Sequence, residues 1–573
     1  AKLVKPSRVK TLATDTADLY TWDFGDGTSP VTGQTPAHTF VEPFLVNRTV
    51  TLSVTRGTGI SSTSASTTQI LTIIPPPEPP KWFVAGMAYS DGAVTGTVWQ
   101  SEITIFNPDP TRSGTYSVAF LDGRTVANPA NLAWQPLTIG PRKSLSSSNV
   151  LGEFFGQAKG SYGAVLVRGD AAPVPPVITA RTYNNGDPAK GTFGLSVPAT
   201  QASSGVSQQS LAAQQLLIGL RDDATAYTNI GLVNLISTDW SHAHLTFFDR
   251  DGTNLGVIDV DVPPWGVVQL TRPLTGGGWL GKPPTSLFRV RVTVNSGGAV
   301  YPYATVIDQA STDPIVVTPT EQPLNSYRIP GILRATGAHG ERWRSRFTIA
   351  NPSGGAARKV RLVFSYVSCG ANGCGSHVSI SGDIIMNPGQ TQSADDFVKV
   401  WLGLMGDITV DDAKSYQESF LDVSPGDSNT DPLVVLGETY NDTPGGHIGL
   451  QIPGYTPLDG ASRTGANKRL VLTGVQASAA YRSNLSLFAV AGTTGKWCSV
   501  HVYAPTGEKL RDIPVFVDGF SQVNSGALFQ PGDPSGASVV IDNIDDGVTV
   551  AGYATIIDNT SGDATFVKAQ PAP

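Results

Sequence analysis

The sequence predicts an all-β protein, built as a tandem array of antiparallel β-sandwich domains of the immunoglobulin-like kind. Its 573 residues are too many for one hydrophobic core, so several domains are expected. Glycine (62 residues) and proline (42) are abundant while charged residues make up only 15%, which favours short strands and turns over helices. Alternating apolar runs recur about every ten residues with turn residues between them, as in β-sandwiches.

Residues 1–74 are predicted to form the first domain. Residues 50–54 alternate strictly between apolar and polar side chains, as a strand with one buried face does. Before them stand Trp-Asp-Phe-Gly-Asp-Gly at residues 22–27 and His-Thr-Phe at residues 38–40. This pair of motifs resembles the PKD-type immunoglobulin-like domain, a β-sandwich that serves extracellular proteins as a spacer or binding module. The resemblance implies that Trp22 is a core residue and that Asp26 forms a turn.

The start of this domain departs from the family pattern. Only about 20 residues precede the first motif, where two full strands are expected. The first strand is therefore predicted to be short, absent or supplied from elsewhere, for example by a neighbouring subunit. Residues 75–80 then hold five prolines in six positions, which predicts a stiff polyproline II linker.

The rest of the chain is written twice, each time as a pair of unlike modules. The pattern Trp-x-Ser-x-x-Thr-Ile-x-Asn-Pro at residues 99–108 returns at residues 343–352, and Tyr-Ala-Thr-Val/Ile-Ile-Asp at residues 303–308 returns at residues 553–558. Because each copy must bury its own apolar face, the repeats predict an architecture before they predict a function. Four β-sandwich modules are expected: A1 (81–200), B1 (210–321), A2 (325–454) and B2 (467–573).

The repeated aromatic and polar positions are open to two interpretations. A shared ligand platform would explain them, but buried rings that fix the corners of sandwiches explain them better. The set comprises Tyr183, Tyr303, Tyr440 and Tyr553 together with Asn107 and Asn351.

Two of the three cysteines are placed to form a disulfide, which would need an oxidising environment. Cys369 and Cys374 flank Gly-Ala-Asn-Gly between two alternating runs, which predicts a hairpin tip closed by a disulfide. Two free thiols are the alternative, and the spacing is not that of a zinc site. Cys498 falls in phase with Val500 and Val502, so we expect a buried, unpaired side chain.

Candidate metal ligands are few. Asp427, Asn429 and Asp431 place oxygen donors at alternate positions, as an extended Ca²⁺ loop does, although a polar turn is the favoured interpretation. Weaker candidates are Asp23 with Asp26 for Ca²⁺, and His242 with His244, which would share one face of a strand. No other cofactor is expected.

Several function classes lack support in the sequence. The sequence has no stripe of Lys and Arg of the kind that indicates nucleic-acid binding. It also has no run of about 18 apolar residues that would predict a membrane span. Nucleophile-elbow, zinc-protease and P-loop motifs are missing too, so we expect no enzymatic activity. Composition, the disulfide and an opening residue Ala1 rather than Met favour an extracellular or cell-surface location.

The leading hypothesis is therefore a non-catalytic extracellular structural protein. It would be a multi-domain rod that self-associates through sandwich edges into a cell-surface filament, sheath or layer. The alternative is a surface adhesin or carbohydrate-binding protein that uses loop tryptophans on a surface polysaccharide. The candidates are Trp82, Trp134, Trp265, Trp279 and Trp401. An accessory region of a hydrolase, with its catalytic domain outside this chain, is the third hypothesis.

Overall fold

The chain forms two units, Ala1–Pro79 and Pro80–Pro573, each with its own contacts. The computed structural model describes residues 18–25, 27–38, 46–56, 63–73, 81–92, 96–125, 132–172, 174–206, 215–236, 239–276, 278–320, 324–337, 340–371, 373–405, 410–411, 413–429 and 431–573. Nearly all regular structure within these ranges is antiparallel β-sheet, as the sequence predicts.

The described part of the first unit is one four-stranded sheet in the order β2-β1-β3-β4. Its strands are β1 (Asp18–Asp23), β2 (Val31–Thr32), β3 (Val46–Arg56) and β4 (Thr63–Ile73). Phe24 is buried and stacks on Trp22 and His38, while the indole of Trp22 donates to the Gly33 carbonyl at 2.9 Å. Trp22 is only half-buried, so Phe24 is the more enclosed residue of the motif. Asp26 and the question of the first strand lie outside the described residues.

The second unit holds four sandwiches. A1 consists of β5 (Lys81–Asp91), β6 (Val98–Phe106), β7 (Gly114–Asp122), β8 (Gln135–Ile139), β9 (Ser144–Ser147), β10 (Ser161–Ala171), β11 (Val177–Asn184) and β12 (Phe193–Pro198). B1 consists of β14 (Gln215–Asp222), β15 (Ala226–Asn234), β16 (Ser241–Asp249), β17 (Asn254–Val262), β18 (Val267–Thr271), β19 (Thr285–Ser296), β20 (Val300–Asp308) and β21 (Pro314–Val317).

The second pair of sandwiches follows the same plan. A2 consists of β22 (Tyr327–Pro330), β24 (Arg342–Ala350), β25 (Arg358–Gly370), β26 (Gly373–Met386), β27 (Thr391–Ala394), β28 (Ser415–Pro425), β29 (Val434–Thr443) and β30 (Gly446–Pro453). B2 consists of β31 (Arg469–Val475), β32 (Tyr481–Gly492), β33 (Lys496–Tyr503), β34 (Lys509–Val517), β35 (Phe520–Val523), β36 (Ala537–Asp542), β37 (Val548–Asp558) and β38 (Ala564–Lys568).

Short additions complete the modules. The small strands are β13 (Thr200–Gln201), β23 (Ala335–Thr336) and β39 (Gln570–Ala572). A1 and A2 each have one helical element after the fifth strand, a π-helical turn (Val150–Phe154) in A1 and α1 (Phe397–Met405) in A2. B2 has α2 (Ser525–Leu528) at the same place in its strand order.

All four modules share one topology, although the sequence shows only a pairwise repeat. Counting the eight strands of each module, one sheet has the order first, sixth, third, fourth, and the other has fifth, second, seventh, eighth. In A1 the two sheets also join at one corner, where β5 pairs with β6. The unlike modules A and B therefore share one sandwich topology.

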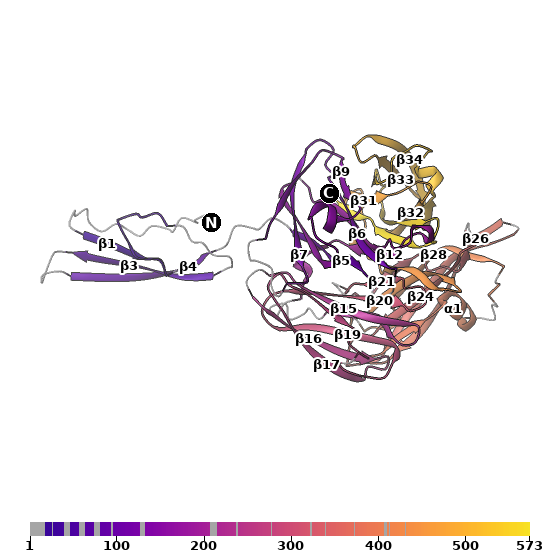
Figure 1. Ribbon diagram of the computed structural model, residues 1–573, viewed down its shortest axis with the longest axis horizontal. Coiled ribbons are helices and arrows are strands. Elements are labelled where there is room, and N and C mark those ends of the chain that lie inside the picture. The colour runs from indigo at the N-terminus through magenta and orange to yellow at the C-terminus, as the bar shows by residue number, and fades with distance from the viewer. Residues whose placement is uncertain are drawn as a thin grey trace. The chain divides into compact units, whose positions relative to one another are not determined.

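The four sandwiches close into a ring instead of extending as a rod. The eighth strands meet at its centre, where β12 contacts β21 and β38, and β30 contacts the same two strands (Figure 1). Hydrogen bonds between A1 and B2 close the circle, for example from the Thr192 amide to Asp558 at 2.9 Å. The expectation of a rod is therefore wrong for this unit, because modules far apart in sequence share buried joints.

The hydrophobic cores run across the joints. One cluster combines Phe83 of A1 with Tyr301 of B1, whose ring centroids are 4.8 Å apart. A second cluster combines β14 residues of B1 with Leu436 of A2, and a third combines Phe347 of A2 with Tyr553 of B2. Each of these three joints therefore belongs to the protein interior and adds to the hydrophobic stabilisation of the whole ring.

Candidate functional site

A glycine at a bulge in or directly after the first strand of each module forms the centre of each joint. Gly86, Gly219, Gly331 and Gly474 all have left-handed backbones, with φ of 65°, 73°, 68° and 76°. Each lies against the seventh strand of the next module, and the facing residues are Tyr303, Leu436, Tyr553 and Thr179 respectively. Glycine suits this position because it adopts positive φ without strain and lets another side chain approach closely.

A hydroxyl from the second strand holds each bulge in place. Ser345 Oγ accepts from the Leu333 amide at 2.8 Å, two residues after Gly331. The same bond recurs between Ser101 and Ala88, Thr228 and Arg221, and Ser483 and Gln476. The repeated serine of the Trp-x-Ser pattern is therefore a structural residue that shapes the joint.

The two joints that lead from a B module to an A module share a further motif. In B1, Ser311 Oγ donates to the His447 carbonyl at 2.6 Å, and the Gly449 amide donates to Asp313 Oδ2 at 2.8 Å. In B2, Ser561 Oγ donates to the Thr192 carbonyl at 2.7 Å, and the Gly194 amide donates to Asp563 Oδ2 at 2.9 Å. An Asp-x-x-Ser-x-Asp sequence at residues 308–313 and 558–563 supplies these groups.

The charges at these two joints are arranged in opposite ways. In the register of the A1 strands, Arg181 lies opposite Glu102. In A2, Glu438 lies opposite Arg346, so the acid and the base have exchanged strands. Arg181 makes a buried ion pair with Asp563 of B2 at 2.8 Å, and desolvation by burial raises the pKa of Glu102. In A2, Glu438 bonds Arg346 at 2.5 Å and lies 3.8 Å from Arg221 of B1.

Two aspartates in these joints are buried and electrostatically linked. Burial raises the pKa of Asp563 to about 6, although Arg181 and the Gly194 amide lower it. Burial also raises the pKa of Asp313 well above its usual value, and the charge of Asp563 adds to that rise. The Oδ1 atoms of both side chains are buried without a hydrogen-bond partner. The positive charge of Arg181 thus lowers the pKa of both carboxyl groups, although Arg181 forms an ion pair only with Asp563.

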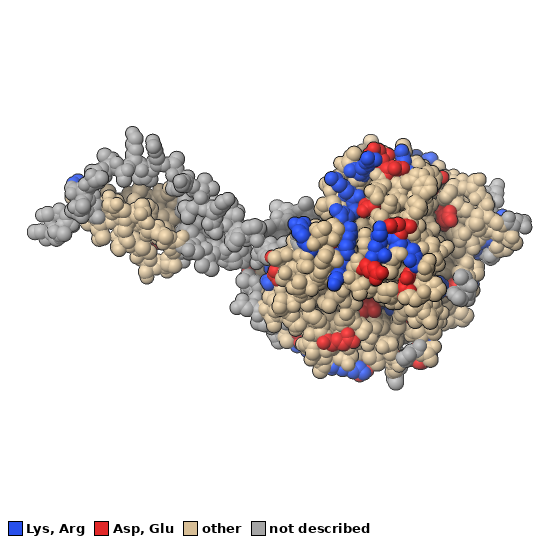
Figure 2. Space-filling model, turned by 90° about the horizontal axis from the view of Figure 1, so that it is seen from above, with Lys and Arg blue, Asp and Glu red and all other residues tan. Residues whose placement is uncertain are grey.

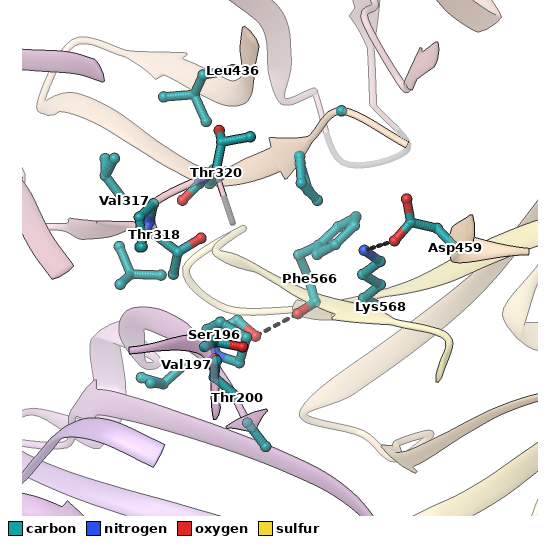
Figure 3. Close-up of a pocket in the computed structure, with 18 of the residues that line it drawn as sticks. Ser196, Val197, Thr200, Val317, Thr318, Thr320, Leu436, Asp459, Phe566 and Lys568 are labelled. Carbon is teal, nitrogen blue, oxygen red and sulfur yellow. Dashed lines mark hydrogen bonds and ion pairs between the residues drawn. The ribbon is translucent and has the colours of Figure 1, made fainter. Parts of the chain in front are cut away.

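A cavity of about 1040 Å³ lies along the ring axis and is lined by all four modules. Figure 3 shows Ser196 and Thr200 of A1, Thr318 and Thr320 of B1, and Phe566 of B2 around it. Lys568 and Asp459 form an ion pair at 2.5 Å on its wall and are the charged residues among those that line it. The Oε1 atom of the buried Gln215, another lining residue, has no hydrogen-bond partner. This cavity was not predicted, because its walls come from strands more than 300 residues apart in sequence.

The predicted Ca²⁺ loop surrounds a guanidinium group. Arg358, whose side chain has no exposed surface, donates to the Asn429 carbonyl at 2.8 Å and to the Asp431 carbonyl, and lies 3.6 Å from Asp427. Asp427 also accepts from the Lys359 and Asn429 amides, and Asn429 accepts from the Asp431 amide. These contacts favour the polar-turn interpretation, since the oxygen donors are directed to a side-chain cation and to backbone amides.

His242 and His244 do share one strand face, as predicted, but each is bound to a neighbouring aspartate. His244 Nδ1 lies 2.7 Å from Asp259, and His242 contacts Asp261. Among the described residues, no group of three or more His, Cys, Asp or Glu side chains is placed to hold a metal ion.

Most of the predicted carbohydrate-binding tryptophans are in the core. Trp82, Trp265 and Trp401 are buried, and Trp134 is half-buried beneath the Arg168 guanidinium. Trp279, at 43% exposure, is the one of the five with a large free surface. Trp240 and Trp497 are also exposed.

The structural interpretation of the repeated residues agrees with their positions. The four tyrosines Tyr183, Tyr303, Tyr440 and Tyr553 are all buried. Asn107 has no exposed surface and donates to three backbone carbonyls, and Asn351 does the same in A2. Cys369 and Cys374 form the predicted disulfide, and Cys498 is buried, which raises the pKa of its thiol to about 12.

The face of the molecule shown in Figure 2 carries both signs of charge. On the face shown in Figure 2, Lys and Arg lie beside Asp and Glu, and most of the surface is uncharged. Within the residues that the structure describes, no helix has the length and apolarity to cross a bilayer.

Comparison with known proteins identifies the first unit. Residues 6–71 match the PKD domain family, which confirms the resemblance seen in the two sequence motifs. A comparison with curated proteins returns no match for this chain. The chain therefore combines a PKD domain with tandem β-sandwiches, a combination typical of extracellular multidomain proteins.

Proposed function

We propose that this chain is a non-catalytic structural protein of the cell exterior, whose copies associate through sandwich edges into a filament, sheath or layer. The observation that carries the proposal is the closure of four sandwiches into one ring through four equivalent joints. Three of these joints connect consecutive modules, and the fourth joins B2 to A1. Such a ring is a rigid building block, because moving any one module would disturb two buried joints.

The polar chemistry of the repeats supports a structural role. Ser345 and its equivalents hold backbone bulges, and Ser311 with Asp313 binds backbone groups of the next module. The buried Arg181–Asp563 pair likewise connects two modules. The residues that recur in both halves of the chain thus connect strands and modules.

Exposed sheet edges supply surfaces for association. The fourth strand of each module is the outer strand of its sheet, and β4 is the outer strand of the described sheet in the first unit. β4 is 11 residues long, carries no charged side chain and is exposed over residues 63–70. Open edges of this kind accept further strands through their free N–H and C=O groups.

The experiment is to image the purified full chain by negative-stain electron microscopy at several concentrations and to measure its mass by analytical ultracentrifugation. We expect ordered oligomers or filaments whose proportion rises with concentration. A chain that stays monomeric under all extracellular-like ionic conditions would contradict the proposal.

The axial cavity favours one second candidate, the binding of an uncharged hydroxylated ligand such as a neutral polysaccharide end. Its wall carries hydroxyls, aliphatic groups and the unpartnered Gln215 Oε1, and its one cation is already paired with Asp459. Calorimetric titration with neutral oligosaccharides tests it. Binding should be lost in Thr318→Trp, which fills the cavity, and retained in Trp279→Ala, which lies outside it. Binding lost only in Trp279→Ala would place the ligand on the outer surface instead.

A further inference from the structure

The outer strand β26 of A2 differs from the other strands at the same place in the fold. It is 14 residues long and pairs with β25 from Met386 to Gly373, and no described strand pairs with its other edge. With β25 it forms a hairpin that projects from the ring in Figure 1. The disulfide between Cys369 and Cys374 ties the two strands together at the tip. β26 is therefore a long open edge held firmly in one register.

The equivalent strands of the other modules carry the features that protect sheet edges. β8 has only five residues and contains Pro136, while β17 carries Asp259 and Asp261. β34 carries Lys509, Arg511 and Pro514. β26 contains no Pro, Lys or Arg, and its one acid, Asp383, is neutralised by Lys359 at 2.9 Å and Arg361 at 3.2 Å. Because such residues discourage edge-to-edge pairing, β26 is the edge that lacks this protection.

From Val378 to Met386 the inner face of β26 carries only glycine and apolar side chains, and helix α1 packs against it. Even-numbered residues face inward, since Gly382 lies against Trp401 and Met405 of α1. Val378 on this face is 43% exposed, and α1 exposes Val400 (41%) and Leu404 (67%). A strand added beside β26 would place its own inward side chains over this apolar surface and remove it from water.

We propose that β26 is a strand-addition surface whose occupant is β26 of a second copy, paired antiparallel about a two-fold axis at Gly382. In that register Ile380 faces Ile384 of the partner and Val378 faces Met386, so every inward pair is apolar. Contacts of this self-complementary kind are the commonest way in which soluble proteins form symmetric dimers. The proposal rests on the self-association proposed above and names the strand that makes it.

The test compares two matched substitutions in the full chain. Val378→Lys places an ammonium group opposite the apolar Met386 of the partner, whereas Val257→Lys changes the same residue type, 38% exposed, on the equivalent strand β17. Sedimentation equilibrium should show the dimer dissociation constant rising by about tenfold or more in Val378→Lys, because a charge is buried at the interface. In Val257→Lys it should stay within about twofold of the unchanged chain, as expected for a surface change away from the interface.

Hydrogen exchange supplies an independent readout. Amide protection in residues 373–386 should increase with protein concentration, since pairing engages the free edge of β26. Association that is equal in both variants, or β26 exchange that is independent of concentration, overturns this assignment while leaving association through other edges intact. Protection of β26 that appears only when a different protein is added also overturns it. A chain that never associates overturns both proposals.

Discussion

Asp313 and Asp563 occupy equivalent positions in B1 and B2, but only Asp563 has an arginine partner. Arg181 lies 2.8 Å from Asp563, whereas the residue at the place of Arg181 in A2 is Glu438. The sequence repeat at residues 308–313 and 558–563 marks both aspartates as special, and it could be read without a structure. Their burial and their mutual influence could not, because both depend on contacts with modules that are distant in sequence.

The first prediction concerns the pH dependence of stability. Asp313 has a folded pKa above its unfolded value of about 3.9, so its stabilising contribution is complete below that value and is lost as pH rises through the folded pKa. Asp313→Asn keeps an acceptor for the Gly449 amide and removes the charge. We expect its melting temperature to exceed that of the unchanged chain by about 1–3 °C near pH 7, with no gain near pH 4.

Asp563→Asn is the matched control for that measurement. It leaves the buried Arg181 without its charged partner at the joint, so we expect a loss of about 3 kcal/mol in the free energy of unfolding near pH 7. Equal effects of the two substitutions in thermal scans would show that the arginine does not distinguish the two carboxyl groups.

At the scale of elements, the strands and hairpins could be predicted well and the bulges could not. Alternating runs and turn residues predict most strands, and Gly219 stands out as the counterpart of Gly474 in the repeat. What these glycines do is decided by the neighbouring module, which presses a side chain against the bulge. Local pattern carries no information about such a contact, because the facing residues are about 217 to 295 positions away.

The second prediction separates backbone strain from crowding at two of these bulges. In Gly331→Ala the new Cβ would lie 2.8 Å from Tyr553 Oη, whereas in Gly474→Ala the nearest atom is 3.6 Å away. Chemical denaturation should show a loss of about 1–2 kcal/mol for Gly474→Ala from strain alone, and about 2–4 kcal/mol for Gly331→Ala. Gly403→Ala in α1, where no atom lies within 4 Å, should instead stabilise by about 0.5–1 kcal/mol.

At the scale of the whole molecule, four sandwiches could be predicted but their ring could not. Module count follows from repeats and chain length, whereas the angle at each joint depends on shape complementarity between surfaces that no local signal describes. In the predicted rod, each module would contact only its neighbours in sequence. The joint between B2 and A1 is incompatible with such a rod, and the axial cavity exists only because the ring is closed.

The third prediction is that residues 80–573 unfold as one cooperative body. Their hydrophobic clusters cross the joints, so loss of one module exposes core surface of the next. Differential scanning calorimetry of the full chain should show one large transition for the ring and a separate small one for the PKD domain, which forms its own unit. Four resolved transitions of similar size would mean that the joints contribute little.

The opposite charges of Arg181 in A1 and Glu438 in A2 determine which B module docks on each A module. If B2 docked on A2 by mistake, Asp563 would meet Glu438, and if B1 docked on A1, Arg221 would meet Arg181. A1 and A2 present similar docking surfaces within one chain, so a B module could bind the wrong one during folding. Repulsion between like charges at a buried contact disfavours that wrong pairing. Arg181→Glu combined with Glu438→Arg should therefore lower the refolding yield, because each A module would then repel the B module that normally docks on it.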